Sequence, residues 1–536
     1  MANNTFFLTT HTSIKHKIKK MAEKTRVRFA PSPTGPLHMG GVRTALYNYL
    51  YAKQSGGNFI LRIEDTDSQR FVPGAEEYII EALAWCGISP DEGVDNGKMV
   101  ETPSEKHPHA PYRQSQRKHL YREYAEQLVA NGFAYYAFDT SEELDKLRAQ
   151  FESRGETFTY NHLVREKLNT SLNLSKEETY KRLSEGNHWV VRFKMPVDRI
   201  VKMNDMIRGE IEVNSNTLDD KVLWKAVDEL PTYHLANIVD DHLMEITDVI
   251  RGEEWLPSLP LHYLLYEALG WDKNQPRFAH LSLLLKPDGK GKLSKRDGDR
   301  LGFPVFPLEW KNSEGEVSRG YREDGYFPEA FVNLLAFLGW NPGTEQEIFS
   351  LEELVKEFSL ERVVKSGAKF NPDKAHWYNQ EYLRMREPAE LAQDFSRNLS
   401  AKGVSAELSY ITEVVALLKE RAVFVRDFWE LGEFFFKAPS EYDQAVKTKF
   451  WKAETPQILN EISQSLNDLA DFSRENVEQH LPSLIRERGW QMGAVMNTLR
   501  LALVGASKGP GVADIIALLG KDESLGRIQK IIKAFA

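Results

Sequence analysis

The segment from Arg28 to Gly41, RFAPSPTGPLHMGG, joins a short strand candidate to a helix candidate through a turn rich in proline and glycine. Residues 27–30 have strand character, and from Gly41 onward apolar residues recur at the spacing of one helix face. Gly40 and Gly41 leave no Cβ between the turn and a ligand, so we expect free amides and the positive end of the helix dipole to face phosphate oxygens. His38 would lie beside that anion. The segment therefore predicts a nucleotide phosphate site.

The common phosphate motifs do not fit this segment. It lacks the lysine spacing of a P-loop and the G-x-G-x-x-G fingerprint of dinucleotide-binding folds. A histidine beside two glycines is more often an ordinary turn residue, but the whole string is more specific. It resembles the first signature of class I aminoacyl-tRNA synthetases, in the form R-x-A-P-S-P-T-G and H-x-G-G of bacterial-type glutamyl-tRNA synthetases. In that form Gly41 stands where other class I enzymes have a second histidine, which leaves His38 alone in the motif.

A lysine-rich segment far downstream is similar to the second signature of the same family. Residues 292–296 read KLSKR, which resembles the K-M-S-K-S loop in its glutamyl form. The preceding PDGKG, residues 287–291, is a run of turn formers and predicts a flexible hairpin. Alone, KLSKR is more often a solvated charged surface. Its order and distance after the first motif favour contact with a triphosphate.

Further segments predict an amino-acid pocket. Residues 59–63 read as a strand, and Glu64 follows at its carboxyl end, where open α/β sheets bind ligands. Such acidic residues often only cap the next helix, but the L-R-I-E-D-T-D pattern of the family favours contact between Glu64 and the amino group of the substrate. Tyr233 and Asn237 are four residues apart, so on a helix they share one face. Arg251 follows a buried strand candidate, and its planar guanidinium matches a side-chain carboxylate.

The resemblance implies a role for each of these residues. The catalytic residues are expected to be His38, Lys292 and Lys295. The residues expected to bind ATP are His38, Gly40, Gly41, Glu253, Trp255, Lys292 and Lys295. The residues expected to bind glutamate are Arg28, Ala30, Ser32, Glu64, Tyr233, Asn237 and Arg251.

The order of the motifs implies an α/β fold, in which a Rossmann-like parallel-sheet catalytic domain is split by an α+β insertion and followed by an all-α C-terminal module. With 536 residues the chain has material for several domains, and helical spacing dominates from residue 329 onward. The sheet is expected to resume near Val222, with Trp224. With the roles that the resemblance implies, the predicted parts are a basic disordered tail or upstream-start extension (1–20), the first catalytic half (21–103), an inserted domain for the acceptor end of tRNA (104–221), the second catalytic half (222–275), a stem-contact region with the lysine loop (276–375) and a helical anticodon-binding domain (376–536).

Metal binding by the protein is not expected. The chain has one cysteine, Cys86, which excludes an internal disulfide and fits a reducing, cytoplasmic setting. Residues 135–139, YYAFD, are similar to the zinc knob of related enzymes but have alanine and aspartate where zinc binders have cysteines, so no protein-bound zinc is expected. The neighbours Asp240, Asp241 and His242 cannot all face one ion on a helix.

The resemblance implies ATP with Mg²⁺, the ion being held mostly by phosphates and water.

The loop 91–113 is polar and contains His107 and His109, which we expect to be solvated rather than metal ligands.

The net charge of −9 is unusual for a protein that binds RNA, since phosphate contacts call for basic surfaces. Local clusters of Lys and Arg either form a basic track or belong to a mixed surface, and the sequence leaves both open. These clusters are Arg113, Arg117, Lys118 and Arg122, and Lys447, Lys449 and Lys452.

The resemblance implies ligation of L-glutamate to tRNA(Glu) with ATP, by a monomer without a membrane span. Three alternatives remain. A glutaminyl-tRNA synthetase would have a first motif like P-E-P-N-G and a β-barrel anticodon module. A paralogue that glutamylates a modified tRNA base would lack the helical third. An inactive RNA-binding scaffold would have damaged signatures, whereas His38, Lys292 and Lys295 are all present.

Overall fold

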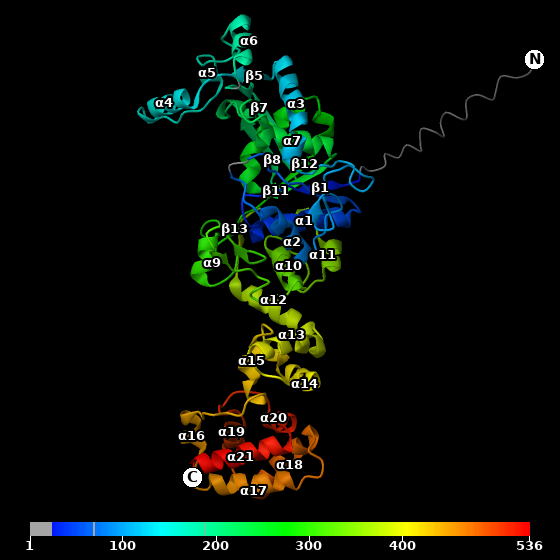
Figure 1. Cartoon of the computed structure of the whole chain (residues 1–536), viewed down its shortest axis with the longest axis vertical. Coiled ribbons are helices and arrows are strands. Elements are labelled where there is room, and N and C mark those ends of the chain that lie inside the picture. The colour runs from blue at the N-terminus through cyan, green and yellow to red at the C-terminus, as the bar shows by residue number, and fades with distance from the viewer. Residues whose placement is uncertain (1–23, 68–69, 187, 536) are drawn as a thin grey trace, which may run out of the picture. The chain divides into compact units, whose positions relative to one another are not determined.

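The computed structural model describes residues 24–67, 70–186 and 188–535, so the predicted basic tail over 1–20 lies outside the described residues (Figure 1). The chain divides into two compact units. Among the described residues, the first comprises those from 24 to 324 and from 331 to 372, and the second comprises 325–330 and 373–535.

A six-stranded sheet in the order β2-β1-β11-β12-β7-β8 forms the centre of the first unit. Its strands are β1 (Arg26–Phe29), β2 (Asn58–Leu61), β7 (Ile200–Asp205), β8 (Gly209–Asn214), β11 (Asp248–Gly252) and β12 (Arg277–Leu281). Neighbouring strands are parallel from β2 to β7, and β8 runs antiparallel at the edge. The central strands are mostly buried on both faces, as in other parallel sheets, and carry apolar residues such as Val27, Val249 and Phe278 between buried polar ones. The predicted parallel-sheet fold is confirmed.

Helices and short strands surround this sheet. The helices are α1 (Met39–Gln54), α2 (Ala75–Trp85), α7 (Tyr233–Leu243), α8 (Leu259–Ala268), α9 (Lys295–Leu301), most of α10 (Pro328–Phe337) and α11 (Leu351–Glu357). The short strands are β3 (Val94–Asp95), β4 (Lys98–Met99), β13 (Leu284–Leu285), β14 (Trp310–Lys311), β15 (Val317–Ser318) and β16 (Ala368–Lys369). Helix α1 begins directly after His38 and buries Val42, Ala45 and Leu46 beneath β1 and β11. The first motif is therefore the turn between β1 and α1.

The inserted part contains a separate four-stranded antiparallel sheet in the order β10-β9-β6-β5. Its strands are β5 (Ala134–Ala137), β6 (Val190–Phe193), β9 (Val222–Lys225) and β10 (Leu230–Pro231). Helices α3 (Lys118–Ala130), α4 (Ser141–Glu152), α5 (His162–Arg165) and α6 (Lys176–Ser184) accompany it. The prediction that the catalytic sheet resumes near Val222 is wrong, because that strand, with Trp224, pairs within the inserted sheet.

The catalytic sheet resumes earlier, at Ile200, because β7 and β8 form a hairpin at its edge. Asp205 ends β7, and its Oδ1 accepts the backbone N–H groups of Ile207 and Arg208 at 3.0 and 2.8 Å, which closes the turn into β8. The chain thus enters the inserted sheet, crosses to the catalytic sheet and returns. Periodicity identifies strands but not their partners, so the sequence alone placed this boundary about 20 residues too late.

The loop 91–113 is anchored against strand β2 by buried residues, although much of its middle part is exposed. Glu92 is buried and accepts the Tyr112 hydroxyl at 2.9 Å, and its backbone oxygen accepts the Leu61 amide at 3.0 Å. His107 is only 4% exposed, and its Nδ1 accepts the Gly93 amide at 3.4 Å. The expectation that His107 is solvated is therefore wrong, whereas His109 is half-buried. Polar composition indicated a surface loop but not that its anchoring residues are buried.

Hydrogen bonds hold the segment that resembles a zinc knob. Asp139 accepts the Tyr160 hydroxyl at 2.7 Å and the Asn169 amide at 3.0 Å. Tyr135 donates its hydroxyl to Asp220 at 2.6 Å. These bonds connect residues 135–139 to two later parts of the inserted domain, around residues 160–169 and at Asp220.

The second unit is helical, which confirms the predicted all-α module (Figure 1, yellow to red). Its helices are α12 (Pro372–Met385), α13 (Pro388–Ala401), α14 (Leu408–Leu418), α15 (Asp427–Gly432), α16 (Gln444–Phe450), α17 (Thr455–Asn467), α18 (Arg474–Glu487), α19 (Met492–Val504), α20 (Val512–Leu519) and α21 (Lys521–Phe535). One apolar core connects them, with Phe395, Leu459 and Leu499 almost fully buried. Throughout the described part of the chain, the helices are too short or too polar to cross a membrane.

Candidate active site

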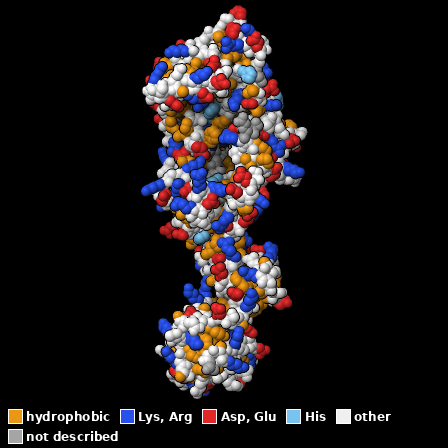
Figure 2. Space-filling model, turned by 60° about the vertical axis from the view of Figure 1, so that its left-hand side comes forward, with side chains coloured by type: hydrophobic (Ala, Val, Ile, Leu, Met, Phe, Trp, Pro, Cys, Tyr) orange, Lys and Arg blue, Asp and Glu red, His pale blue; other side chains and the backbone are white. Residues whose placement is uncertain are grey.

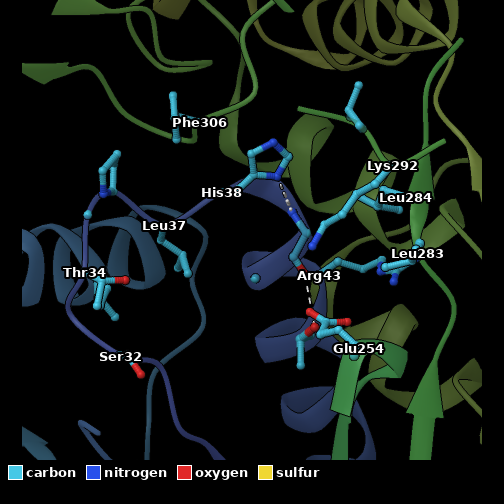
Figure 3. A pocket seen from close by; sticks show the side chains of 18 of the residues that line it. Ser32, Thr34, Leu37, His38, Arg43, Glu254, Leu283, Leu284, Lys292 and Phe306 are labelled. Carbon is cyan, nitrogen blue, oxygen red and sulfur yellow. Dashed lines mark hydrogen bonds between the residues drawn. The ribbon is translucent and has the colours of Figure 1, made fainter. Parts of the chain in front are cut away.

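A cavity of about 510 Å³ lies at the turn between β1 and α1 (Figure 3). Its lining includes Ser32, Thr34, His38, Gly40, Gly41, Arg43, Thr44, Gly252, Glu254, Ser282, Lys292 and Phe306. Figure 3 shows His38 between Phe306 and Lys292, with Glu254 on the opposite side of the cavity. The two sequence signatures therefore meet at one cavity, which we call the nucleotide cavity.

His38 caps helix α1 and presents one ring nitrogen without a partner. Its Nδ1 accepts the Gly40 amide at 3.3 Å, so in a neutral ring the proton is on Nε2. Nε2 is buried and makes no hydrogen bond with any described residue. Burial, and then the neighbouring Lys292, lower the pKa of His38 to about 4. The ring is therefore neutral at pH 7, with one N–H group available for a ligand.

The two glycines of the motif act differently from the prediction. The Gly40 amide donates to His38 Nδ1, and the Gly41 amide donates to the His38 carbonyl oxygen at 2.8 Å. The prediction of two free amides facing phosphate is therefore wrong, because the capping histidine takes both. A Cβ at Gly41 would lie 2.5 Å from Leu37 Cδ1, which explains why a second histidine is not accommodated without movement of Leu37.

The lysine loop presents its two lysines differently. Lys292 lines the nucleotide cavity, and its backbone forms an isolated antiparallel β-bridge with Leu285 of β13. Lys295 is the first residue of α9, is exposed and is not part of the lining. Ser294 and Asp297 cap this short helix. Of the predicted lysine pair, the structure thus brings only Lys292 to the cavity.

Several lining residues escaped the sequence analysis. Glu254 and Thr44 line the nucleotide cavity, and Phe306 lies with its ring centroid 5.9 Å from that of His38. Arg43 is buried and donates to the backbone oxygens of Leu338 and Ser282. Phe306 comes from the segment 303–325, which carries none of the motifs described above. Only the position of Glu254 after a strand offered a signal in the sequence.

Glu253, predicted to contact ATP, lies outside the cavity lining. Its carboxylate pairs with Arg208 and accepts the Leu283 amide at 2.8 Å. Leu283 itself lines the nucleotide cavity. Glu253 is therefore placed to position the backbone of the cavity wall rather than to touch the nucleotide. Trp255, also predicted to contact ATP, lies at a second cavity.

This second cavity, of about 240 Å³, adjoins the first and is called here the amino-acid cavity. All seven residues predicted to bind glutamate line it: Arg28, Ala30, Ser32, Glu64, Tyr233, Asn237 and Arg251. Trp255 also lines it, with its ring centroid 4.1 Å from that of Tyr233. Gly40, Gly41 and Glu254 line both cavities. The two cavities therefore share a wall at the start of α1.

Buried ion pairs hold the acidic side of the amino-acid cavity. Glu64 Oε1 accepts from Arg62 Nη2 at 3.2 Å and from Asn237 Nδ2 at 3.1 Å. Burial raises the pKa of the Glu64 carboxyl, and Arg62 and Arg28 oppose that shift. Asp241 accepts from Arg28 Nε at 3.0 Å and from Arg62 Nη1 at 2.8 Å. Asp241 thus fixes Arg28, which lines the cavity, and Arg62, which holds Glu64.

The basic side of the cavity is formed by Arg251 and Tyr233. Arg251 Nη1 donates to the Tyr233 hydroxyl at 2.9 Å, and Nη2 donates to the Trp255 carbonyl oxygen at 3.4 Å. Because the Tyr233 oxygen accepts from an arginine, its own proton is free to donate to a ligand. An arginine N–H and a tyrosine O–H are thus placed together for an acceptor group.

The carboxylates on α7 are bound by arginines. Arg117 Nε donates to Asp240 at 2.8 Å, and Arg28 and Arg62 bind Asp241. His242 instead stacks on Trp271, at a centroid distance of 3.8 Å. Across the ranges that the structure describes, no group of three or more His, Cys, Asp or Glu side chains is arranged to hold a metal ion.

Comparison with known proteins places this geometry in a family. The family model described as tRNA synthetases class I (E and Q), catalytic domain, matches residues 24–377. The chain belongs to this family of class I tRNA synthetases. A second model, described as an anticodon binding domain, matches residues 387–532 of the synthetase. Most of the helical unit therefore matches a family of anticodon binding domains, in agreement with the helical anticodon-binding domain expected from the sequence.

Relatives of the synthetase match it over nearly its whole length. A glutamate–tRNA ligase of Flavobacterium johnsoniae is 58% identical, covering 96% of this chain and 100% of the relative. A glutamate–tRNA ligase of Parabacteroides distasonis is 54% identical over 95% and 99%. The crystal structure of a glutamate tRNA ligase from Elizabethkingia meningosepticum in complex with its amino acid has a TM-score of 0.91 at 53% identity, over 96% of this synthetase and 100% of that chain. These matches confirm the predicted family and fold.

Proposed function

We propose that this synthetase joins L-glutamate to tRNA(Glu) in two steps, through glutamyl-adenylate. The observation that carries the proposal is the charge of the amino-acid cavity, where Arg28, Arg251 and Glu64 face the same space. Two guanidinium groups and one carboxylate complement the two carboxylates and one ammonium group of glutamate. Relatives named glutamate–tRNA ligase, at 53% to 58% identity, support the same substrate.

In the first step, an α-carboxylate oxygen of glutamate attacks the α-phosphorus of ATP, and the bond to pyrophosphate breaks. Negative charge grows on the phosphate oxygens, so donors that meet this charge lower the barrier. The Nε2–H of His38 and the ammonium of Lys292 are the side-chain donors at the nucleotide cavity that we assign to this task. No covalent enzyme intermediate is required.

In the second step, a hydroxyl of the terminal tRNA ribose attacks the carbonyl carbon of glutamyl-adenylate, and AMP leaves. Mg²⁺ would enter with ATP and would neutralise charge on its phosphates in the first step. Glu254 lines both cavities and is the acidic side chain we expect to reach that ion, directly or through water.

The test of this function is glutamate-dependent exchange of pyrophosphate into ATP. We expect exchange with glutamate when tRNA(Glu) is present, little without tRNA, and none with glutamine. Exchange supported only by glutamine would overturn the substrate. A complete lack of exchange under all conditions would instead favour an inactive RNA-binding scaffold.

Lys295 has a role in this proposal only if the lysine loop moves when ATP binds. The hairpin before it contains Gly289 and Gly291 with φ values of 77° and 86°, a left-handed conformation that glycine adopts without strain. Closure of this hairpin would carry Lys295 towards the triphosphate. The proposal therefore assigns Lys295 to the transition state rather than to the resting cavity.

We expect Lys295→Ala to lower the rate of activation about 10- to 100-fold and to leave the glutamate KM unchanged, because the interaction would exist only in the transition state. Lys292→Ala should also raise the ATP KM, since Lys292 already lines the cavity. Exchange kinetics at varied glutamate and ATP measure both effects. An equal loss of glutamate affinity in Lys295→Ala contradicts this role.

The helical unit supplies the surface proposed for tRNA. The lining of a cavity of about 900 Å³ in this unit includes four basic residues, Arg421, Lys437, Arg500 and Lys508, and three acidic ones, Glu430, Glu433 and Glu441. Burial and the charge of Arg421 lower the pKa of Arg500, which indicates that positive charges adjoin there. Together with the match to an anticodon-binding family, this cavity supports tRNA as the macromolecular partner.

The basic track considered from the sequence is not favoured at the inserted part. Arg113, Arg117 and Arg122 each pair with a carboxylate. Figure 2 shows Lys and Arg interspersed with Asp and Glu over the visible face, as in a mixed surface. A monomeric state and a cytoplasmic location stay predictions, the latter resting on the single, buried Cys86.

The double variant Arg421→Gln/Lys508→Gln should raise the tRNA KM about 10-fold and make that KM less dependent on salt. The variant would make fewer contacts with phosphates, so fewer counterions would be released when tRNA binds. The glutamate KM at saturating tRNA should not change. The double variant Arg397→Gln/Arg474→Gln removes two exposed arginines of the same unit, paired with Asp394 and Asp514, and is the charge-matched control. Aminoacylation at several salt concentrations measures the effect, and equal behaviour of both variants would remove this cavity from the tRNA surface.

A further inference from the structure

Arg251 uses nearly all its donors before any substrate arrives. Its Nε donates to His280 Nε2 at 3.0 Å, and its Nη1 group donates to the Tyr233 hydroxyl and meets His262 Nδ1 at 3.3 Å. One Nη2 proton points to the Trp255 carbonyl oxygen. A guanidinium has five N–H groups, so one, on Nη2, is left for a ligand.

The contact with His280 continues to a buried carboxylate. His280 Nδ1 lies 2.7 Å from Asp205 Oδ2, and both side chains are essentially inaccessible to water. Arginine can only donate, so His280 Nε2 must accept, and the ring proton therefore lies on Nδ1 and is donated to Asp205. The other oxygen of Asp205 is held by two backbone amides at the turn from β7 to β8. Asp205 thus fixes the direction of this chain of hydrogen bonds.

The contact with His262 extends in the same way. His262 Nδ1 accepts from Arg251, so its Nε2 carries the proton and donates to His234 Nδ1 at 3.4 Å. His262 is fully buried. Burial lowers the pKa of His234 to about 4 and also lowers the pKa values of His262 and His280, so all three rings are neutral at pH 7.

We propose that Asp205, His280 and His262 are positioning residues that set the direction of the hydrogen bonds around Arg251, so that the substrate side chain meets only donors. With His280 and His262 as acceptors, Arg251 keeps one Nη2–H, and Tyr233 keeps its O–H, for the cavity. A carboxylate of glutamate satisfies both donors. The amide NH₂ of glutamine, itself a donor, would lie against one of these two donors. A buried site disfavours a ligand that leaves two donors opposed. This inference rests on the proposed function, in which Arg251 reads the side-chain carboxylate.

Asp205→Asn tests the direction of the chain with little change in shape. Asn can still accept the two turn amides through its oxygen, so its NH₂ then faces His280 Nδ1 and forces the ring proton onto Nε2. Two N–H groups, those of Arg251 Nε and His280 Nε2, would then oppose each other. We expect the glutamate KM to rise about 10- to 100-fold, the scale for a buried donor that loses its partner. The preference for glutamate over glutamine should fall, while the ATP KM stays unchanged.

A pair of substitutions at His280 provides a second test. His280→Gln can accept from Arg251 with its amide oxygen and donate to Asp205 with its nitrogen, so it should keep most of the preference for glutamate. His280→Leu can do neither and should resemble Asp205→Asn. Glu267→Gln changes an exposed carboxylate on α8 to an amide and is the matched control. All variants are measured in the full chain by exchange in the presence of tRNA(Glu).

The outcomes separate the inference from the proposed function. If the unaltered synthetase shows no glutamate-dependent exchange, the function fails. If it does, but Asp205→Asn and His280→Leu keep the glutamate KM and the preference over glutamine, the positioning role is overturned. Equal increases in the KM values for glutamate and ATP would also overturn it, because they indicate general damage. If a variant does not fold, ¹⁵N NMR of the His280 ring in the unaltered synthetase decides, since a proton on Nε2 contradicts the inference.

Discussion

Replacement of Arg251 by alanine is expected to raise the glutamate KM about 100-fold or more. Arg251 is 4% exposed, and its loss leaves His280 Nε2, His262 Nδ1 and the Tyr233 hydroxyl without their donor. Removing one member of a buried, hydrogen-bonded charged pair costs about 2–5 kcal/mol, and each ~1.4 kcal/mol is tenfold in affinity. The ATP KM should remain unchanged, because Arg251 lines only the amino-acid cavity.

Arg251→Lys separates charge from geometry. Lysine keeps the positive charge but cannot reproduce the planar fork that reaches His280, Tyr233 and the substrate together. We expect an intermediate KM for glutamate and a reduced preference over glutamine. Arg199→Ala is the control, because Arg199 is an exposed arginine that pairs with the exposed Glu267. Initial rates of exchange at varied glutamate give the KM, and an unchanged value for Arg251→Ala would refute the assignment.

The amino-acid cavity was predictable because its residues follow strands of a parallel sheet. Glu64 comes shortly after β2, and Arg251 lies at the end of β11. The carboxyl ends of parallel strands meet at one edge of the sheet. Tyr233 and Asn237 share a helix face, which their spacing already indicated. Local patterns thus placed these side chains together without knowledge of the fold. The assignment of roles came from the resemblance to the family.

The sequence could not predict contacts that depend on which distant elements pack together. Phe306 reaches His38 from a loop more than 250 positions later, and His280 and Asp205 meet only because β12 pairs with β7. The spacing of apolar residues along the chain does not indicate which distant residue will lie beside a given side chain. The same limit explains the boundary near Val222, where a correctly recognised strand was given the wrong sheet.

The error at the phosphate turn has a different cause. Free amides at a helix start are the general expectation, but a side chain that caps the helix can take them first. His38 does so through Nδ1 and its carbonyl oxygen. Capping by histidine is not among the usual signals at an N-cap, where Ser, Thr, Asp and Asn dominate. The donor that faces the ligand therefore moves from the backbone to the imidazole Nε2.

Because of this shift, His38→Ala is expected to lower the activation rate about 100- to 1000-fold, the cost of removing one preorganised donor to a developing oxyanion. The glutamate KM should change little, since His38 does not line the amino-acid cavity. His38→Gln can offer an amide N–H and should recover part of the rate. The measurement is single-turnover formation of adenylate at saturating glutamate, ATP and tRNA. A rate for His38→Ala within a few-fold of the unaltered synthetase would remove His38 from the transition state.

The pH dependence gives an independent check on the same residue. The pKa of His38 is lowered to about 4, by burial first and by Lys292 second. A free histidine titrates near pH 6.5, but His38 should remain neutral from about pH 5 upward, with Nε2 protonated throughout. Between pH 5.5 and 8, the activation rate of the unaltered synthetase should therefore show no step near pH 6.5 that is due to His38. A step that is present in the unaltered synthetase and absent from His38→Gln would contradict this expectation. Such a step would mean that His38 acts as a charged imidazolium, in which case the hydrogen bond from the Gly40 amide to Nδ1 could not persist.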